Sequence, residues 1–160
     1  RRMMGWNEIL GSDVHNDGGR GAALGKLDAS AIIHFWYGSD KIAAKAIREG
    51  RQVVNSTSHM TYINKGYDKL PLSKSYSFEP VFAGLNPEQQ KNVIGLGCQV
   101  WTEWIADVEK LHRHVFPRIG AYAETGWTRK GGKNFQDFRR RLTGYEKILD
   151  ALGIRHGEKE

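Results

Sequence analysis

The feature that most constrains the fold is a succession of strand, helix and strand in the first third of the chain. Two short apolar runs, Ala31 to Trp36 and Gln52 to Asn55, have the pattern of buried strands. Between them, Asp40 to Glu49 carries apolar residues at helical spacing, and Gly50 provides a stop after it. A unit of this length normally places its two strands in parallel with a right-handed crossover. We therefore expect an α/β fold whose parallel sheet is covered on both faces.

The rest of the chain continues this alternation. Two more runs, Met3 to Trp6 and Gly95 to Trp101, are also predicted to be strands. Helical spacing returns over Asp107 to Glu124, where Pro117 should break or kink the helix, and over Lys133 to Leu152. The apolar stripe of this last helix consists of Phe135, Phe138, Leu142, Tyr145, Ile148, Leu149 and Leu152. The pattern predicts an α/β barrel or a doubly wound sheet; about four strands are half of an eight-stranded barrel, which leaves two open edges.

Two long segments, Gly11 to Leu27 and Gly66 to Pro87, contain Gly, Ser or Pro and are predicted to be loops. Loops of such length usually carry function or are disordered. The chain starts at Arg1 directly in a predicted strand, without an initiator Met or the apolar core of a signal peptide. We therefore expect it to be the distal part of a longer protein.

Basic residues exceed acidic ones, 24 to 18, and part of the excess gathers near the C-terminus. The cluster consists of Arg129, Lys130, Lys133 and Arg139 to Arg141. Such a cluster is more typical of the solvated side of a surface helix than of a nucleic-acid groove, and the chain carries no nucleic-acid-binding motif. We expect no nucleic-acid partner. The alternative, a nucleic-acid binder acting through this cluster, requires an affinity that falls steeply with salt.

The sequence gives little support for a metal site, a disulfide bond or a membrane-spanning segment. Cys98 is the only cysteine, so the chain forms no intrachain disulfide and no multi-cysteine metal site. No paired metal-ligand spacing is found among His15, His34, His59, His112 and His114. We predict neither a metal nor a cofactor. The longest mostly apolar stretch, Ala31 to Tyr37, is far shorter than the roughly 20 residues that cross a bilayer, so no membrane span is predicted.

Three tryptophans fall at the ends of predicted strands. Trp6, Trp36 and Trp101 each close such a run and are followed by a loop. If the sheet is parallel, all three project from its carboxyl face, where α/β barrels build their sites. Flat indole rings suit the C–H faces of sugars, whose hydroxyls seek carboxylates and amides. Taken singly, each tryptophan is better explained as a core or rim residue than as a ligand platform. The presence of three at strand ends shifts the balance towards a sugar site.

Two polar residues accompany these tryptophans. Glu103 lies two residues beyond Trp101, so on a strand its carboxylate would stand beside the indole and accept hydrogen bonds from sugar hydroxyls. A salt bridge at the rim explains the same carboxylate equally well. Tyr62 follows a strand after a short polar stretch, from which its hydroxyl could donate into a site. Taken alone it is a weak signal, because a buried tyrosine usually finds a hydrogen-bond partner whether or not it is catalytic.

These residues lie within strings that together resemble the distal half of a family 20 glycoside hydrolase, a β-N-acetylhexosaminidase. Any one string is weak, but the ordered set covers nearly all of the chain, from Gly5 to about Leu152. The strings are GWNE (5–8), IIHFW (32–36), VVNS (53–56), TYIN (61–64), YSFEP (76–80), GLGCQVWTE (95–103), FPR (116–118) and AETGW (123–127).

The resemblance implies the C-terminal half, about strands 5 to 8, of a (β/α)8 TIM barrel over residues 1–154, followed by a polar tail over 155–160. It implies substrate-assisted hydrolysis, in which the 2-acetamido carbonyl attacks the anomeric carbon. An Asp-Glu pair in the family supplies the acid and the residue that orients the acetamido group. This chain contains no Asp-Glu dipeptide, so we expect the pair upstream of Arg1.

Residue by residue, the resemblance assigns substrate-binding roles to the five residues already singled out. Trp6, Trp36 and Trp101 match tryptophans that wall the pocket around the N-acetyl group and the terminal sugar. Tyr62 matches the tyrosine that hydrogen-bonds the acetamido oxygen and so assists catalysis. Glu103 matches the carboxylate that binds hydroxyls of the non-reducing sugar.

The chain departs from the family pattern at two places. Asn64 stands where the tyrosine motif usually has Asp, so any charge of that position is missing. The stretch Lys69 to Ser75 is short and lacks a further tryptophan that many members carry. Outside the site, Arg118, Glu124 and Trp127 are expected to pack the last helix and loop, with buried ion pairing as one form of that packing.

The sequence thus predicts part of an exo-β-N-acetylhexosaminidase that acts on glycans ending in N-acetylglucosamine or N-acetylgalactosamine. Its partner is the N-terminal half of the same barrel, and the chain alone is expected to be inactive. The alternative is a non-catalytic carbohydrate-binding module that uses the same tryptophans and Glu103. The resemblance alone favours a secreted or periplasmic location.

Overall fold

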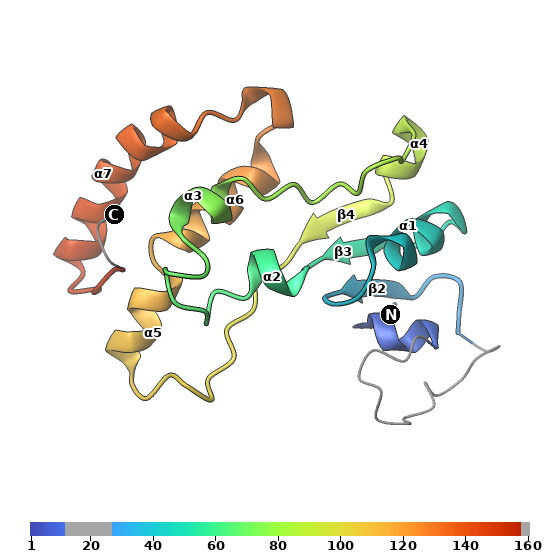
Figure 1. The fold of residues 1–160 in the computed structure, drawn as a ribbon, viewed down its shortest axis with the longest axis horizontal. Helices are drawn as coiled ribbons and strands as arrows, with labels where there is room; N and C mark the ends of the chain where they lie inside the picture. Colours follow the sequence, from blue (N-terminus) through green and yellow to red (C-terminus); the bar gives the residue numbers. More distant parts are fainter. Residues whose placement is uncertain (12–26, 158–160) are drawn as a thin grey trace. The chain divides into compact units, whose positions relative to one another are not determined.

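The structure, a computed structural model, describes residues 1–11 and 27–157 of the chain (Figure 1). The predicted loop Gly11 to Leu27 lies almost entirely outside the described residues, as do the end of the predicted tail and His15. Among the helices described, none is long and apolar enough to cross a bilayer. The chain divides into two compact units, Arg1–Ser58 with Pro80–Gly97 and His59–Glu79 with Cys98–Glu160.

The first unit is built on a four-stranded sheet in the order β1-β2-β3-β4, with every neighbouring pair parallel (Figure 1). Its elements are β1 (Met4–Trp6), the 3-10 helix η1 (Asn7–Leu10), β2 (Ile32–Phe35), α1 (Asp40–Arg48), β3 (Val53–Asn55), α4 (Pro87–Gln90) and β4 (Val93–Leu96). Trp6 pairs with His34, and Ile33 pairs with Val53. The prediction of an α/β fold with parallel strands is confirmed.

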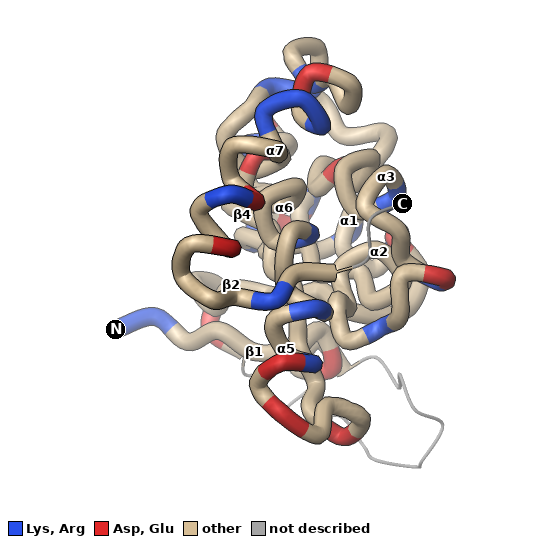
Figure 2. Tube along the Cα trace, turned by 90° about the vertical axis from the view of Figure 1, so that its left-hand side faces the viewer, with Lys and Arg blue, Asp and Glu red and all other residues tan. Residues whose placement is uncertain are grey.

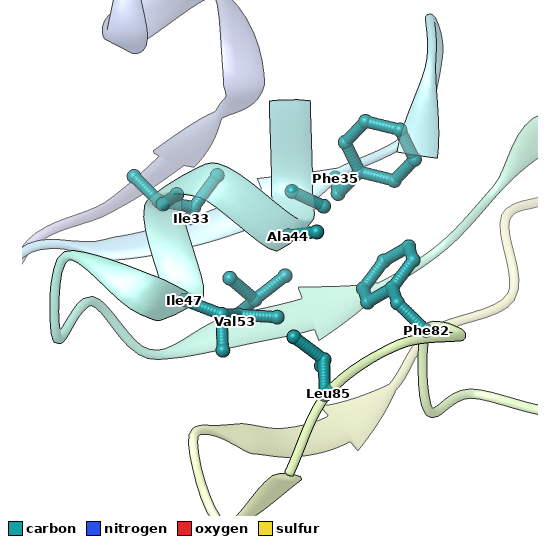
Figure 3. Packing of buried hydrophobic residues seen from close by; sticks show 9 residues of the cluster. Ile33, Phe35, Ala44, Ile47, Val53, Phe82 and Leu85 are labelled. Carbon is teal, nitrogen blue, oxygen red and sulfur yellow. The ribbon is translucent and has the colours of Figure 1, made fainter. Parts of the chain in front are cut away.

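Helix α1 connects β2 to β3 and forms where the periodicity predicts it. The Ser39 side chain accepts a hydrogen bond from the Lys41 backbone at 3.3 Å, which caps the first turn. Gly50 adopts a φ of 86°, a conformation that favours glycine and ends the helical run. The buried face of α1 packs on the sheet in a core that contains Ile33, Phe35, Ile47, Val53, Phe82 and Leu85 (Figure 3). Burying each such large side chain stabilises the unit by about 1.5–3 kcal/mol.

The second unit is helical. Its elements are α2 (Ser58–Thr61), which starts at the last residue of the first unit, α3 (Leu72–Tyr76), α5 (Val108–Val115), α6 (Arg118–Trp127), the 3-10 helix η2 (Lys130–Gly132) and α7 (Phe135–Ala151). Its core joins α3, α6 and α7 through Leu72, Tyr76, Ala121, Phe138 and Leu142. The break predicted at Pro117 is confirmed, because α5 ends at Val115 and α6 begins at Arg118.

Three predictions about elements are wrong. The strand expected over Gly95 to Trp101 is β4, Val93–Leu96, because its partner β3 ends at Asn55, the residue paired with Leu96. The segment Gly66 to Pro87 is not only loop, since α3 buries Leu72 and Tyr76 one helical turn apart. The predicted apolar stripe of α7 is also too long, because Ile148 and Leu152 are exposed.

Candidate functional site

Trp6 and Trp36 lie together at the carboxyl ends of the first two strands. Trp6 is the last residue of β1, and Trp36 directly follows β2. The Trp6 ring stacks on the His34 ring, with centroids 4.4 Å apart and planes 16° apart. It meets the Trp36 ring edge to face at 6.1 Å and 73°. Parallel pairing thus gathers two of the predicted residues and His34 into one aromatic group.

Asn7 and Glu8, at the start of η1, hold Trp36 in this group. Asn7 is fully buried; its side-chain oxygen accepts a hydrogen bond from the Trp36 backbone at 3.0 Å, and its amide donates to the Tyr37 carbonyl at 3.2 Å. The Glu8 carboxylate accepts the indole N–H of Trp36, with distances of 3.0 and 3.1 Å to its two oxygens. Both the backbone and the ring of Trp36 are therefore fixed. Sequence reasoning missed these two residues, although polar side chains directly after a strand end were a usable signal.

The His34 ring lies against one face of the Trp6 ring. Its Nε2 lies 2.5 Å from the hydroxyl oxygen of Ser56, a fully buried residue. Burial lowers the pKa of His34 from its ordinary value. A neutral imidazole at neutral pH therefore forms the platform on which Trp6 stacks.

Tyr62 and Trp101 form a second group, in the second unit. Tyr62 pairs with Gln99 as an isolated parallel bridge, in which the Ile63 N–H donates to the Gln99 carbonyl at 3.0 Å. The Gln99 N–H donates in turn to the Thr61 carbonyl at 3.1 Å. The Tyr62 and Trp101 ring centroids are 6.2 Å apart. The structure brings these two predicted residues together through backbone pairing.

The geometry predicted for Trp101 and Glu103 is wrong. Neither residue lies on a strand, because β4 ends at Leu96 and Glu103 falls in a turn. Both side chains are exposed. Within the part of the chain that the structure describes, Glu103 makes no hydrogen bond and no ion pair, so the rim salt bridge considered for it does not form there.

Arg118 fixes the segment that follows Tyr62. It is fully buried, and its guanidinium donates to the carbonyls of Ile63 at 2.5 Å, of Lys65 at 2.8 Å and of Leu70 at 3.0 Å. It also donates to the His114 carbonyl one turn before it. Among the described residues no carboxylate pairs with Arg118, and the ion pairing considered for this group of residues forms instead between Glu124 and Arg141. Burial lowers the pKa of Arg118, but the carbonyls satisfy its donors.

Trp127 does not pack as expected. It is 94% exposed at the end of α6, while Glu124 accepts the Tyr76 hydroxyl at 2.8 Å and pairs with Arg141 at 2.6 Å. A cavity of about 550 Å³ lies beside it between α6 and α7, lined among others by Ala123, Leu142 and Tyr145. None of the five predicted site residues lines this cavity. It is therefore not part of the predicted site.

The C-terminal basic cluster is largely engaged within its own unit. Lys130 pairs with Glu79 at 3.7 Å, and Arg140 and Arg141 both pair with Asp137 at 2.5 and 2.8 Å. Lys133 donates to the Phe78 carbonyl at 2.9 Å. Within the cluster Asp137 is the one acidic position. Figure 2 shows acidic and basic segments interspersed over the visible tube. This arrangement favours a solvated helix surface over a nucleic-acid groove.

The five predicted residues thus fall in two groups, one in each unit. Trp6 and Trp36 belong to the first unit, and Tyr62, Trp101 and Glu103 belong to the second. Within residues 1–11 and 27–157, no three His, Cys, Asp or Glu side chains are placed to hold a metal ion.

Comparison with known proteins gives a consistent result. The sequence profile described as "Glycosyl hydrolase family 20, catalytic domain" matches residues 1–130. A beta-hexosaminidase of Porphyromonas gingivalis is 28% identical over 169 residues, which cover 98% of this chain and 20% of that protein. A beta-N-acetylhexosaminidase of Cellulomonas fimi is 25% identical over 170 residues, 97% of this chain and 31% of that protein.

Solved structures give the same result. The crystal structure of a family 20 exo-β-N-acetylglucosaminidase from Vibrio harveyi, in complex with N-acetylglucosamine, matches with a TM-score of 0.81 and 27% identity over 99% of this chain and 25% of that one. A β-N-acetylhexosaminidase from Streptomyces coelicolor shares the fold, with a TM-score of 0.80 at 23% identity over 99% of this chain and 33% of that one. The chain spans 20–31% of the length of the two curated relatives.

Proposed function

Because the chain belongs to glycosyl hydrolase family 20, we propose that it is part of the catalytic barrel of an exo-acting β-N-acetylhexosaminidase. In this proposal residues 1–154 supply the C-terminal half of the barrel, about strands 5 to 8, and residues 155–160 form a polar tail. The complete enzyme releases terminal N-acetylglucosamine or N-acetylgalactosamine from glycans. The observation that carries the proposal is the family match over residues 1–130, which include all five candidate site residues.

In this proposal Trp6 and Trp36 supply apolar walls for the sugar. The indoles of Trp6 and Trp36 offer faces and edges against which the C–H groups of an N-acetylated sugar pack. Because the Glu8 carboxylate and the Asn7 amide already hold Trp36, this ring needs little ordering when a ligand binds. Asn7 and Glu8 act here as positioning residues.

In this proposal Tyr62 and Glu103 supply polar contacts to the sugar, and Trp101 a further apolar one. The Tyr62 hydroxyl donates to the acetamido carbonyl oxygen of the substrate and orients it toward the anomeric carbon. The exposed Glu103 carboxylate accepts hydrogen bonds from sugar hydroxyls, and the Trp101 ring, 6.2 Å from that of Tyr62, forms a further wall. Arg118 positions Tyr62 by holding the carbonyl of the next residue, Ile63.

The proposed reaction is a retaining, substrate-assisted hydrolysis. The acetamido oxygen forms a bond to the anomeric carbon while the bond from that carbon to the leaving oxygen breaks, which gives an oxazolinium ion. The leaving oxygen takes a proton from the Glu of an Asp-Glu pair, and water then opens the ring to the retained sugar. This chain contains no Asp-Glu dipeptide, so the proposal places that pair in the N-terminal half of the barrel.

An assay with separately supplied halves tests this proposal. The chain alone and the chain co-expressed with the upstream half are each given an aryl β-N-acetylglucosaminide and an aryl β-glucoside, which lacks the acetamido group. We expect turnover only of the N-acetylated substrate, and only by the two halves together. Turnover by the 160 residues alone would contradict the upstream acid, and equal cleavage of the glucoside would contradict substrate assistance. An inactive assembly would contradict the enzyme assignment.

The absence of an Asp-Glu dipeptide from the chain also favours a second candidate, a carbohydrate-binding module without catalysis. This candidate requires the chain as it stands to bind N-acetylglucosamine. Titration calorimetry with the sugar measures that binding, and Trp101→Ala should abolish it. Binding by the chain together with an inactive assembly of both halves would favour the module.

A further inference from the structure

The register of the first two strands places His34 beside Trp6. The two residues are direct partners in the parallel pairing of β1 with β2. Partners in a sheet point their side chains to the same face, and here the two rings stack, with centroids 4.4 Å apart and planes 16° apart. The stack is therefore a consequence of the register, and the face of Trp6 that His34 covers is closed to a ligand.

His34 points away from the core of the first unit. It stands between Ile33 and Phe35 on β2, and both of these side chains are buried in the core that α1 covers (Figure 3). Because successive side chains of a strand alternate between the two faces, His34 leaves the face of the sheet opposite α1. Helices cover the outside of a (β/α)8 barrel, so in the half barrel proposed above this is the inner face. His34 then lies inside the barrel, near the carboxyl end of its strand.

Ser56 anchors the His34 ring. Its hydroxyl oxygen lies 2.5 Å from Nε2 of His34, and the residue is fully buried directly after β3. The Ser56 backbone N–H donates to the Phe35 carbonyl at 2.7 Å, so Ser56 is itself held at the end of β2. A ring that is bonded through one nitrogen to a fixed partner keeps its orientation. His34 therefore offers Trp6 a surface of fixed orientation.

This arrangement orders the Trp6 indole before a ligand arrives. A side chain that is already ordered loses less conformational freedom when a ligand binds against it. Asn7 and Glu8 order Trp36 in this way, and the stack on His34 does the same for Trp6. An apolar wall contacts the sugar in the ground state and in the transition state alike, so a looser wall weakens substrate binding more than it slows the chemical step.

We propose that His34 is a positioning residue for substrate binding, which holds the Trp6 indole in the orientation that receives the N-acetylated sugar. This inference rests on the proposed function, because it requires Trp6 to contact the sugar. Ser56 acts one step further from the substrate, by fixing the His34 ring.

The experiment measures KM and kcat of the complete enzyme on an aryl β-N-acetylglucosaminide. His34→Ala should raise KM about fivefold and leave kcat within about twofold, since a stacked aromatic pair contributes an effect of this order. His34→Phe returns a flat ring to the side of Trp6 and should recover most of the lost affinity. Ser56→Ala keeps the imidazole but releases it, and should raise KM about twofold.

A double-mutant cycle separates positioning from a general structural effect. If His34 acts through Trp6, His34→Ala should raise KM much less in a Trp6→Ala enzyme than in the unmodified one. Equal increases in the two backgrounds would overturn the inference. Ser56→Ala removes a single hydroxyl, and the same cycle run with it decides the question if His34→Ala does not fold.

His59→Ala is the matched control, because it removes the same imidazole from an exposed position on α2. This variant should leave KM unchanged. An unmodified enzyme that hydrolyses the substrate with a KM insensitive to His34 would overturn the inference and leave the proposed function standing. Failure of the unmodified enzyme to hydrolyse the substrate would overturn the proposed function itself, and with it the inference.

Discussion

The Tyr62 hydroxyl is the single group in this chain on which the proposed chemistry most depends. Replacing Tyr62 with Phe keeps the ring and its contact with Trp101 but removes the donor to the acetamido oxygen. Losing one such donor typically lowers kcat by about 10²–10³-fold. We expect a loss of that size in the complete enzyme on an aryl β-N-acetylglucosaminide, measured under saturating substrate.

Tyr145→Phe is the control for this substitution, because the Tyr145 ring packs against the core of α3, α6 and α7 and makes no hydrogen bond through its hydroxyl among the described residues. It should leave kcat unchanged. A Tyr62→Phe enzyme with unaltered kcat would show that the hydroxyl does not act on the substrate.

Arg118 illustrates a buried charge that is satisfied by backbone alone. Arg118→Met keeps much of the volume but leaves the carbonyls of Lys65 and Leu70 without their donor, while the Ile63 carbonyl keeps only His114 Nδ1, 3.1 Å away. Since each buried unsatisfied acceptor costs about 1–3 kcal/mol, we expect a loss of about 3 kcal/mol or more in the free energy of unfolding, measured with urea. Arg113→Met, which breaks only the exposed pair with Glu109, should cost no more than about 1 kcal/mol. Equal losses for both variants would contradict the structural role of Arg118.

His34 predicts a pH dependence of stability. Burial lowers its folded-state pKa below the 6.5 of an exposed imidazole. As the pH falls below about 6.5 the unfolded chain takes up a proton first, so the free energy of unfolding decreases until the pH has passed the folded-state pKa. This decrease should be smaller in His34→Gln and unchanged in His59→Gln, which alters an exposed ring. A series of urea titrations over this pH range measures it, and identical slopes for parent and His34→Gln would refute the explanation.

For single residues, the sequence predicts which side chains lie close together better than it predicts which groups form hydrogen bonds or ion pairs. Trp6 and Trp36 meet because two parallel strands end side by side, which a pattern of apolar runs is enough to predict. The partners of Arg118 are mostly carbonyls of distant residues, and a carbonyl carries no signature in the sequence. Of the residues for which ion pairing was considered, Glu124 pairs with Arg141, whereas Arg118 is held by carbonyls.

For helices and strands, local sequence patterns predict where an element forms, but they do not predict an end that is set by a distant strand. Helix α1 and the strands on either side of it depend on periodicity, a serine cap and one glycine, all within a short stretch of sequence. The end of β4 depends instead on where its partner β3 ends, at Asn55. The sequence around Gly97 gives no sign of this end. The prediction that Trp101 and Glu103 lie side by side on this strand is therefore also wrong.

The packing of α1 on the sheet supports a stability prediction. Ile47 is 1% exposed and lies in the core with Ile33 and Val53. Ile47→Ala removes three buried carbon atoms and leaves a cavity, which should lower the free energy of unfolding by about 2–5 kcal/mol. Ile148→Ala makes the same chemical change at a side chain that is 58% exposed, and we expect a change within about 0.5 kcal/mol. Urea denaturation measures both; similar values would mean that α1 is not packed as described.

For the molecule as a whole, the sheet of the first unit has an inner and an outer pair of strands. The inner strands β2 and β3 are more buried than β1 and β4, which form its two edges. A closed barrel has no edges, so the proposed half barrel needs further strands beside β1 and β4 to complete it. Met4 on β1 and Ile94 on β4 are large apolar side chains that are exposed at these edges.

An exposed apolar edge strand is a site of unwanted pairing, and this leads to a prediction for the chain prepared alone. We expect the isolated 160 residues to self-associate as their concentration rises, because β4 is an edge strand of the sheet as the structure describes it and carries the exposed Ile94. Ile94→Lys should shift association to higher concentration, since a charge on an edge strand opposes pairing. Sedimentation velocity over a concentration series measures the effect. Ile148→Lys places the same charge on the surface of α7 and should change association much less. An equal effect of both substitutions would mean that net charge, not the strand edge, governs self-association. A parent chain that stays monomeric at all concentrations would show that these edges do not pair.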